Sequence, residues 1–134
     1  MSNQELIACA QAAKSHAYAP YSGFAVGAAV ECEDGTIFTG CNVENAAYGE
    51  SICAERVALT KAVSAGQQQF RAIAIIADSE DYCLPCGSCR QVMMEFCNPE
   101  VFTIVTVSPD GSLAVHTLAQ LLPHGFGPGN LSGG

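Results

Sequence analysis

Residues 51–77 read SICAERVALTKAVSAGQQQFRAIAIIA, and their pattern is the clearest indication of the fold class. Alanine and other good helix formers fill 51–65, and Gly66 follows as a residue that often ends a helix. The run from Arg71 to Ala77 is short, apolar and rich in isoleucine, as expected of a strand buried on both faces of a sheet. A helix followed by such a strand predicts an α/β protein.

The same alternation of helical and extended patterns continues on both sides of this stretch. An apolar stripe with helical spacing precedes Pro20, and the turn signal Asp34-Gly35 predicts a hairpin. Because strands separated by helices pair in parallel through right-handed crossovers, we predict a three-layer α-β-α sandwich with a mixed, mainly parallel five-stranded sheet. The predicted helices span 3–18, 51–65 and 85–96, and the predicted strands span 24–32, 36–41, 71–77, 101–107 and 113–117.

The length and composition indicate one domain. The chain has 134 residues, close to the usual size of a compact domain, and shows no internal repeat. We expect a single domain over 1–134, with an irregular C-terminal tail from about residue 123. Hydrophobic residues make up 49% of the chain and charged residues only 13%, so it must bury a core. So few charges leave part of the surface apolar, which favours association with further copies.

The charge pattern argues against two classes of partner. The 13 acidic residues outnumber the 5 basic ones, and the net charge of -8 repels polynucleotides and favours a small neutral ligand. No stretch approaches the ~20 apolar residues of a membrane helix, and no basic cluster precedes the first apolar residues. We therefore expect a cytoplasmic protein, in which the cysteines stay reduced.

Cysteines mark the starts of two predicted helices. Cys53 stands two residues before Glu55 at one start, and Cys86 and Cys89 form a Cys-x-x-Cys motif at the other. A helix N-terminus stabilises thiolates, and three thiolates would hold zinc while leaving its fourth position to water. On its own, the Cys-x-x-Cys motif also fits a redox dithiol or a structural zinc site. Because a strand-plus-helix unit returns successive helix starts to one sheet edge, the second cysteine site favours a catalytic metal.

Four sequence blocks together resemble the cytidine deaminases, and they occur in the order found in that family. The match is better to the small homotetrameric branch, whose zinc ligands are three cysteines, than to the larger dimeric branch, which uses one histidine. The blocks are Pro20-Tyr21-Ser22 with Phe24 and Val26-Gly27-Ala28-Ala29, then Gly40-Cys41-Asn42-Val43-Glu44-Asn45-Ala46, then Cys53-Ala54-Glu55-Arg56, and finally Pro85-Cys86-Gly87-Ser88-Cys89-Arg90-Gln91.

The resemblance implies one zinc ion per chain, with Cys53, Cys86 and Cys89 as its ligands. It makes Glu55 the catalytic proton shuttle, which takes a proton from water and delivers protons to the pyrimidine N3 and to the leaving ammonia. It also implies that Arg56 donates hydrogen bonds to ligand sulfurs and so offsets part of their negative charge.

The resemblance further implies a site for a nucleoside. Asn42 and Glu44 would bind the ribose hydroxyls, in keeping with the rule that alternate residues of an extended segment face one way. Phe24 would stack on the pyrimidine ring, and Ala54 would supply close backbone contacts to the substrate.

The tail is expected to complete an oligomer. In the tetrameric cytidine deaminases that this chain resembles, a phenylalanine in the matching tail region closes the active site of a neighbouring subunit. The resemblance therefore implies a homotetramer with shared active sites, and it makes Phe126 a substrate-binding residue. The sequence alone gives no role to Arg90 or Tyr48.

The activity implied by the resemblance is zinc-dependent hydrolytic deamination of free cytidine and deoxycytidine to uridine or deoxyuridine and ammonia, in pyrimidine salvage. Two alternatives stay open. A blasticidin-type deaminase has similar zinc motifs but acts on a bulkier nucleoside analogue, although the segment Asn42-Val43-Glu44-Asn45-Ala46 favours cytidine. A zinc-stabilised interaction module would use the metal only to join helices, with a fourth ligand closing the water position.

Overall fold

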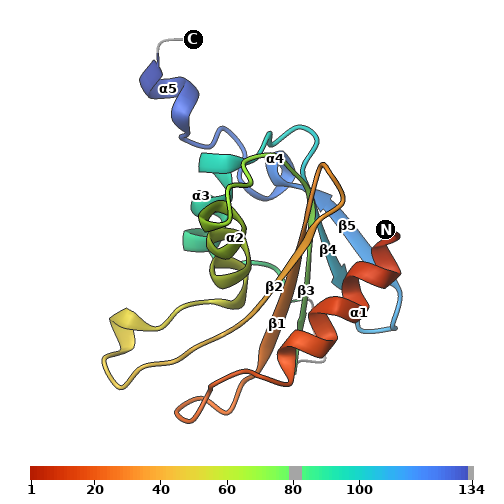
Figure 1. Ribbon diagram of the computed structural model, residues 1–134, viewed down its shortest axis with the longest axis vertical. Coiled ribbons are helices and arrows are strands. Elements are labelled where there is room, and N and C mark those ends of the chain that lie inside the picture. The colour runs from red at the N-terminus through yellow and green to blue at the C-terminus, as the bar shows by residue number, and fades with distance from the viewer. Residues whose placement is uncertain (79–82, 133–134) are drawn as a thin grey trace.

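A five-stranded sheet organises the chain, and its strands lie in the order β2-β1-β3-β4-β5 (Figure 1). The structure, a computed structural model, describes residues 1–78 and 83–132. The strands are β1 (Val26–Cys32), β2 (Ile37–Cys41), β3 (Phe70–Ala77), β4 (Thr103–Val107) and β5 (Leu113–Thr117). The helices are α1 (Asn3–Lys14), α2 (Ala54–Ser64), α3 (Gly87–Phe96), α4 (Leu118–Leu121) and α5 (Pro128–Ser132), with a short 3-10 helix η1 (Tyr48–Glu50).

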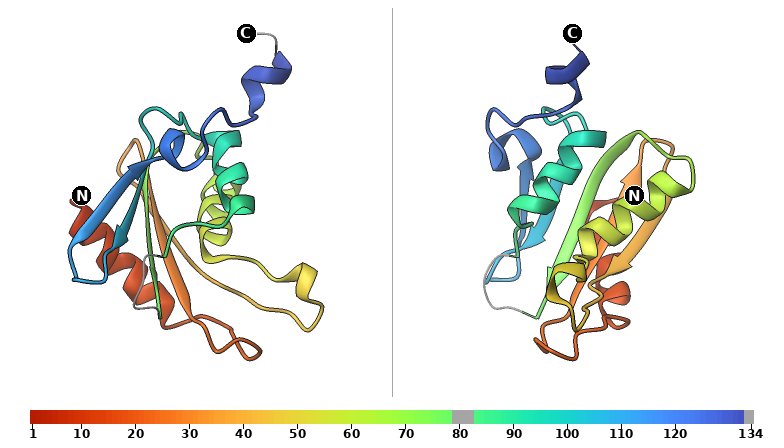
Figure 2. Two further views of the ribbon diagram at one scale, coloured as in Figure 1. Left: turned by 180° about the vertical axis from the view of Figure 1, so that it is seen from behind. Right: turned by 90° about the vertical axis from the view of Figure 1, so that its left-hand side faces the viewer.

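Helices cover both faces of this sheet and complete three layers. α1 packs on one face against β1 and β3, whereas α2 and α3 lie on the opposite face (Figure 1, Figure 2). On β3, Ile73 and Ile75 join the core beneath α2 and α3, and Ala72 and Ala74 join the core beneath α1. All four side chains are fully buried. The predicted α-β-α sandwich and its doubly buried strand are therefore confirmed.

The prediction of a mainly parallel sheet is wrong. Among the described strands only β3 and β4 pair in parallel, since β1 pairs antiparallel with β2 and β3, and β5 pairs antiparallel with β4. The strands that helices separate, β2, β3 and β4, do point the same way. However, the connection through α2 passes over β1, so β1 lies between β2 and β3 and pairs antiparallel with both.

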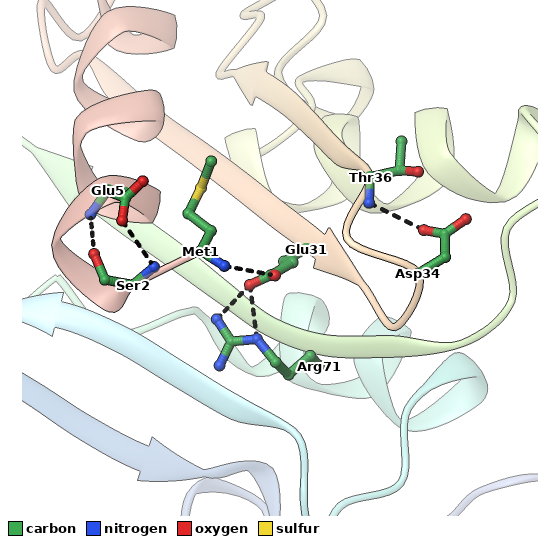
Figure 3. Close-up of polar contacts among 7 residues, drawn as sticks. All are labelled: Met1, Ser2, Glu5, Glu31, Asp34, Thr36 and Arg71. Atoms are coloured by element: carbon green, nitrogen blue, oxygen red, sulfur yellow. Dashed lines mark hydrogen bonds and ion pairs between the residues drawn. The ribbon is translucent and has the colours of Figure 1, made fainter.

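α1 begins at a capping box and ends earlier than the sequence predicted. The Ser2 hydroxyl accepts a 3.1 Å hydrogen bond from the Glu5 amide, and the Glu5 carboxylate accepts one from the Ser2 amide (Figure 3). The predicted helix continued to residue 18. Tyr18 instead exchanges backbone hydrogen bonds with Asn42 and Glu44, which draws the chain toward the segment that follows β2.

A buried carboxylate on β1 has positive groups on two sides. Glu31 is 5% exposed, and it accepts a 2.7 Å hydrogen bond from Nε of Arg71 on β3. The amino group of Met1 lies 3.5 Å from its second oxygen (Figure 3). A buried charge is costly without such partners, so this ion pair fixes how the start of α1 lies over the sheet.

Two glycines let helices approach the sheet closely. A Cβ atom at Gly27 of β1 would lie 2.0 Å from the carbonyl oxygen of Ala10 in α1. At Gly40 of β2 it would lie 2.6 Å from the amide nitrogen of Ala58 in α2. Both separations are shorter than any side chain tolerates, so each helix sits at a distance that only glycine permits. For α2, this contact also sets the position of its N-terminal residues.

The tail that was predicted to be irregular contains a short helix. α5 starts at Pro128, whose fixed φ suits a first helical turn, and the amide of Gly127 donates a 2.8 Å hydrogen bond to the side chain of Asn130. This helix projects away from the sheet (Figure 1). Residues 133–134, the end of the predicted tail, lie outside the described residues. None of the described helices combines the length and apolar character needed to cross a membrane.

Candidate metal centre and active site

The starts of α2 and α3 lie side by side on one face of the sheet (Figure 2). Cys53 is the N-cap residue of α2 and Cys86 is the N-cap residue of α3. Both have an extended backbone, and neither uses its side chain to cap its helix. Cys89 lies in the first turn of α3. The two helix starts therefore present all three thiols to one another.

The thiol sulfurs of Cys53, Cys86 and Cys89 all lie within 4.8 Å of one another. The Cys86 sulfur is 4.0 Å from that of Cys53 and 3.4 Å from that of Cys89. Two sulfurs bound at about 2.3 Å to a tetrahedral zinc ion are about 3.8 Å apart, so the spacing fits three ligands of one ion. Within residues 1–78 and 83–132, no other group of three or more Cys, His, Asp or Glu side chains has this spacing. The structure thus brings the predicted ligands together.

The thiols of Cys53 and Cys89 have pKa values shifted in opposite directions. A hydrogen bond from Cys89, then one from Cys86 and the charge of Arg56, lower the pKa of the Cys53 thiol to about 6. The hydrogen bond with Cys53, followed by burial, raises the pKa of Cys89. At neutral pH the cluster therefore carries a thiolate, which is the form of cysteine that binds a metal ion.

Glu55 lies in the first turn of α2, and only 6% of its surface is exposed. Burial raises the pKa of its carboxyl group, and the negative charge of Cys53 adds to that effect. A raised pKa suits a group that must both take up and release a proton near neutral pH. The structure places the predicted proton shuttle beside the predicted metal ligands.

The two neighbours of Glu55 have different environments. Ala54 is fully buried at the first position of α2, between Cys53 and Glu55 in the chain. Arg56 is partly exposed, and its charge favours the thiolate form of Cys53. Among the side chains that the structure describes, Arg56 forms no hydrogen bond with a thiol, so its predicted bonds to sulfur stay a prediction.

The Asn42 side chain forms hydrogen bonds with the backbone of the segment that contains Phe24. Its side-chain oxygen accepts a 2.9 Å hydrogen bond from the Val26 amide, and its side-chain nitrogen donates a 2.8 Å bond to the Phe24 carbonyl. Phe24 itself is 37% exposed, which leaves part of its ring open to a ligand. The amide of Asn42 thus positions the predicted stacking residue, while its contact with ribose stays a prediction.

Glu44 holds the preceding residues of the same segment. Its carboxylate accepts hydrogen bonds from the amides of Tyr21 and Ser22, each at 3.1 Å, and from the Ser22 hydroxyl. These bonds lower the pKa of Glu44, with the Ser22 hydroxyl as the largest cause. The Ser22 oxygen also accepts a 3.0 Å bond from the Phe24 amide. The sequence did not predict this role of Ser22. Although Ser22 stands in one of the four blocks, its partner Glu44 is 22 positions away in the chain, and local spacing does not show their contact.

A cavity of about 360 Å³ lies next to this network. Its polar lining comes from Ser22, Glu44 and Ser51, and its apolar lining comes from Tyr21 and Tyr48. The two tyrosine rings meet edge to face, with centroids 6.1 Å apart. The cavity combines hydroxyl and carboxylate groups with aromatic walls, which suits a sugar-sized polar ligand.

Phe126 is the last predicted site residue, and it lies between α4 and α5. Phe126 is 57% exposed, while its carbonyl oxygen accepts a 2.8 Å hydrogen bond from the Gln91 side chain on α3. The backbone of this segment is therefore fixed, and the aromatic side chain faces outward. Whether its ring reaches a neighbouring subunit stays a prediction.

Known proteins resemble this chain over most of its length. The family model "Cytidine and deoxycytidylate deaminase zinc-binding region" matches residues 1–105. A cytidine deaminase of Sporosarcina psychrophila is 48% identical over 98% of this chain and 96% of its own. A probable cytidine deaminase of Dictyostelium discoideum is 46% identical over 92% of this chain and 84% of its own.

Solved structures agree with these sequence relatives. The crystal structure of cytidine deaminase from Burkholderia pseudomallei superimposes with a TM-score of 0.89 and 46% identity, over 94% of this chain and all of that one. The cytidine deaminase of Mycobacterium tuberculosis superimposes with a TM-score of 0.83 and 38% identity, over 95% of this chain and 98% of that one. With its three clustered thiols, its fold and these relatives, the chain belongs to the zinc-binding cytidine and deoxycytidylate deaminase family.

Proposed function

We propose that this chain removes the amino group of free cytidine and deoxycytidine by hydrolysis, giving uridine or deoxyuridine and ammonia. One observation carries the proposal: three thiols within 4.8 Å of one another lie at the adjoining starts of α2 and α3, and the buried carboxyl group of Glu55 lies in the first turn of α2, two residues after Cys53. A closed structural zinc site needs four protein ligands, and only three lie together among the described residues. The arrangement therefore favours a catalytic metal with one position open.

The metal ligands and Glu55 have separate roles in the proposed reaction. Zinc, when bound by the three cysteines, makes water a nucleophile at neutral pH. Glu55 takes a proton from the attacking water and passes it to N3 of the pyrimidine, which opens C4 to attack. A second proton moves from the new hydroxyl at C4 through Glu55 to the amino group, which leaves as ammonia. Burial keeps bulk water away from the carboxyl group during both transfers.

The segments around the 360 Å³ cavity are proposed to bind the nucleoside. Asn42 and Glu44 take the ribose hydroxyls, the exposed part of Phe24 stacks on the base, and the backbone at Ala54 contacts the pyrimidine. The carboxylate of Glu44 and the net charge of -8 both repel a phosphate group, which favours a free nucleoside over a nucleotide.

The active protein is proposed to be a homotetramer whose subunits share their active sites. Phe126 contributes its exposed ring to the site of a neighbour. Further large apolar side chains that need cover lie on the loops near the cavity, namely Tyr18, Tyr21, Val43, Tyr48 and Ile52. We place the enzyme in the cytoplasm, because none of the eight cysteines forms a disulfide, as expected in a reducing compartment. The conversion of cytidine to uridine supports a role in pyrimidine salvage.

The test measures bound zinc and the absorbance change from cytidine to uridine on the same preparation. We expect one zinc per chain and turnover in the parent protein. Cys86→Ala should lose both, because two thiolates bind zinc far more weakly than three. Cys9→Ala is the matched control and should change neither, because Cys9 lies on α1 across the sheet. Zinc without any turnover in the parent protein would favour the interaction module instead.

A further inference from the structure

Arg90 joins two backbone segments that are far apart in the chain. Its Nε donates a 2.7 Å hydrogen bond to the carbonyl oxygen of Pro85, and its Nη1 donates a 2.7 Å bond to that of Leu121. Pro85 is fully buried and directly precedes the metal ligand Cys86. Leu121 is the last residue of α4. One planar guanidinium therefore fixes the position of the Cys86 loop, residues 85–86, relative to the end of α4.

Both carbonyl oxygens need a donor from outside their own segments. The carbonyl of Leu121 lies in the last turn of α4, where helical carbonyls have no partner in the helix. The carbonyl of Pro85 belongs to a buried residue just before α3, and an unpaired buried carbonyl is costly. Charged donors form the stronger hydrogen bonds, so Arg90 satisfies both groups with one rigid fork.

The next residue on α3 extends the same attachment into the tail. Gln91 donates a 2.8 Å hydrogen bond to the carbonyl oxygen of Phe126. A Cβ atom at Gly127 would lie 3.1 Å from Cε of Met94, so the tail backbone runs close along α3. The helix that supplies two of the three thiols thus also holds the segment that follows α4.

We propose that Arg90 is a positioning residue for the metal centre, which sets the Cys86 thiol by holding the Pro85 carbonyl and couples it to the segment from Leu121 onward. Cys86 depends on this support because its own side chain does not cap α3. Removing the Arg90 guanidinium leaves the Pro85 carbonyl without this donor and lets the Cys86 loop shift relative to Cys53 and Cys89. The inference rests on the proposed function only in taking Cys86 as a zinc ligand.

The test compares Arg90→Met, Arg90→Lys and Gln91→Met without any nucleoside present. Zinc affinity is measured by competition with a chromophoric chelator, and the thiolate-to-metal absorption band is recorded after Co²⁺ replaces zinc. In Arg90→Met we expect zinc affinity to fall about 10- to 100-fold, as for other residues that support a ligand, with a shifted cobalt band. Arg90→Lys should recover only part of the affinity, because a lysine ammonium lacks the planar fork.

Gln91→Met is the matched control, because Gln91 contacts the tail but not the Cys86 loop. It should keep the parent zinc affinity and cobalt band. Parent values in a folded Arg90→Met variant would overturn the proposal. Full recovery in Arg90→Lys would overturn it as well, because charge alone would then suffice.

A second measurement uses the unaltered protein and does not depend on the folding of a variant. Hydrogen exchange is followed at the amides of residues 118–127 with zinc bound and after its removal by a chelator. If Arg90 couples the two segments, metal removal should speed exchange at the end of α4, where the Leu122 amide bonds to Leu118. Faster exchange confined to the start of α3 would overturn the coupling. None of these readouts needs turnover, so a protein that binds zinc as expected but fails to deaminate cytidine would contradict only the proposed function.

Discussion

Among the described residues Glu55 has no ion-pair partner, although its carboxyl group is buried and interacts with the thiols of Cys53 and Cys89. We predict that Glu55→Gln keeps one zinc per chain but slows deamination about 10²- to 10⁴-fold, because glutamine cannot move protons. Turnover number and zinc content check this prediction. Glu50→Gln is the control, since Glu50 is exposed on η1 and should keep parent turnover. Near-parent rates in Glu55→Gln would remove the proton shuttle from the mechanism.

Ser22 bridges the Glu44 carboxylate and the Phe24 amide, so its removal should affect both. In Ser22→Ala we predict that the pKa of Glu44 rises toward its ordinary value, because the hydrogen bond that lowers it most is lost. The KM for cytidine should rise up to about tenfold, because Glu44 and Phe24 are then held less firmly in the positions proposed to bind the nucleoside. NMR titration of Glu44 and steady-state kinetics measure the two effects.

The pH dependence of this contact has a definite sign. Because the pKa of Glu44 is lowered in the folded protein, the contact stabilises the fold above the ordinary pKa and is lost as pH falls through the lowered one. Ser22→Ala should therefore weaken the fold at neutral pH and lose less stability on acidification. Ser15→Ala is the control, because the Ser15 hydroxyl bonds only to a backbone carbonyl at the end of α1. An unchanged Glu44 pKa in Ser22→Ala would contradict the assignment.

Residues with distinctive chemistry were predictable from the sequence, and residues that act through backbone partners were not. Cys53, Cys86, Cys89 and Glu55 stand at helix starts in a spacing that carries its own chemical meaning. Arg90 looks like any charged residue on a helix until the Pro85 and Leu121 carbonyls are seen beside it. Its partners are set by tertiary packing, which local spacing does not encode.

At the scale of elements, Gly27 and Gly40 offer a matched pair of substitutions, because each lies beneath a different helix. Gly27→Ala and Gly40→Ala should each lower the free energy of unfolding by about 1–3 kcal/mol, since the new methyl group pushes a helix off the sheet. Gly40→Ala should also weaken zinc binding, because it displaces α2 and with it Cys53. Gly27→Ala displaces α1 and should leave zinc affinity unchanged. Thermal unfolding and chelator competition measure the two quantities, and equal zinc affinities would contradict the link between β2 packing and the metal centre.

Hydrophobic periodicity predicted the type and order of the main helices and all five strands. Strand β5 agrees at both ends, and β3 differs by one residue at its start. The errors lie where a distant segment decides the outcome. α1 stops early because the backbone of Tyr18 pairs with residues beyond β2, and β3 gains an antiparallel neighbour because β1 is inserted beside it. Short helices such as α4 and η1 escape prediction because three or four residues carry no detectable period.

At the scale of the whole molecule, α5 projects away from the sheet (Figure 1). Removing residues 125–134, or changing Phe126 to Ala, should raise the KM for cytidine up to about tenfold while zinc stays at one per chain, since one aromatic contact is lost. Val101→Ala is the control, because Val101 is 60% exposed and Phe126 57%. Sedimentation of the parent protein should give a tetramer. A fully active monomer, or truncated protein with parent kinetics, would contradict the shared site.

Cys53 and Cys86, at the two helix starts, are 33 positions apart in the chain, and all of β3 lies between them. An ion that binds both thiols acts as a removable cross-link, because it closes a loop and so lowers the conformational entropy of the unfolded chain. By the arithmetic used for disulfides, closing a loop of this length is worth about 4 kcal/mol, a large share of the stability of a small domain. The stability of the fold and the catalytic activity therefore depend on the same ion. A cell short of zinc would lose the catalytic activity, and it would also hold a less stable chain, of which a larger fraction is unfolded and open to degradation.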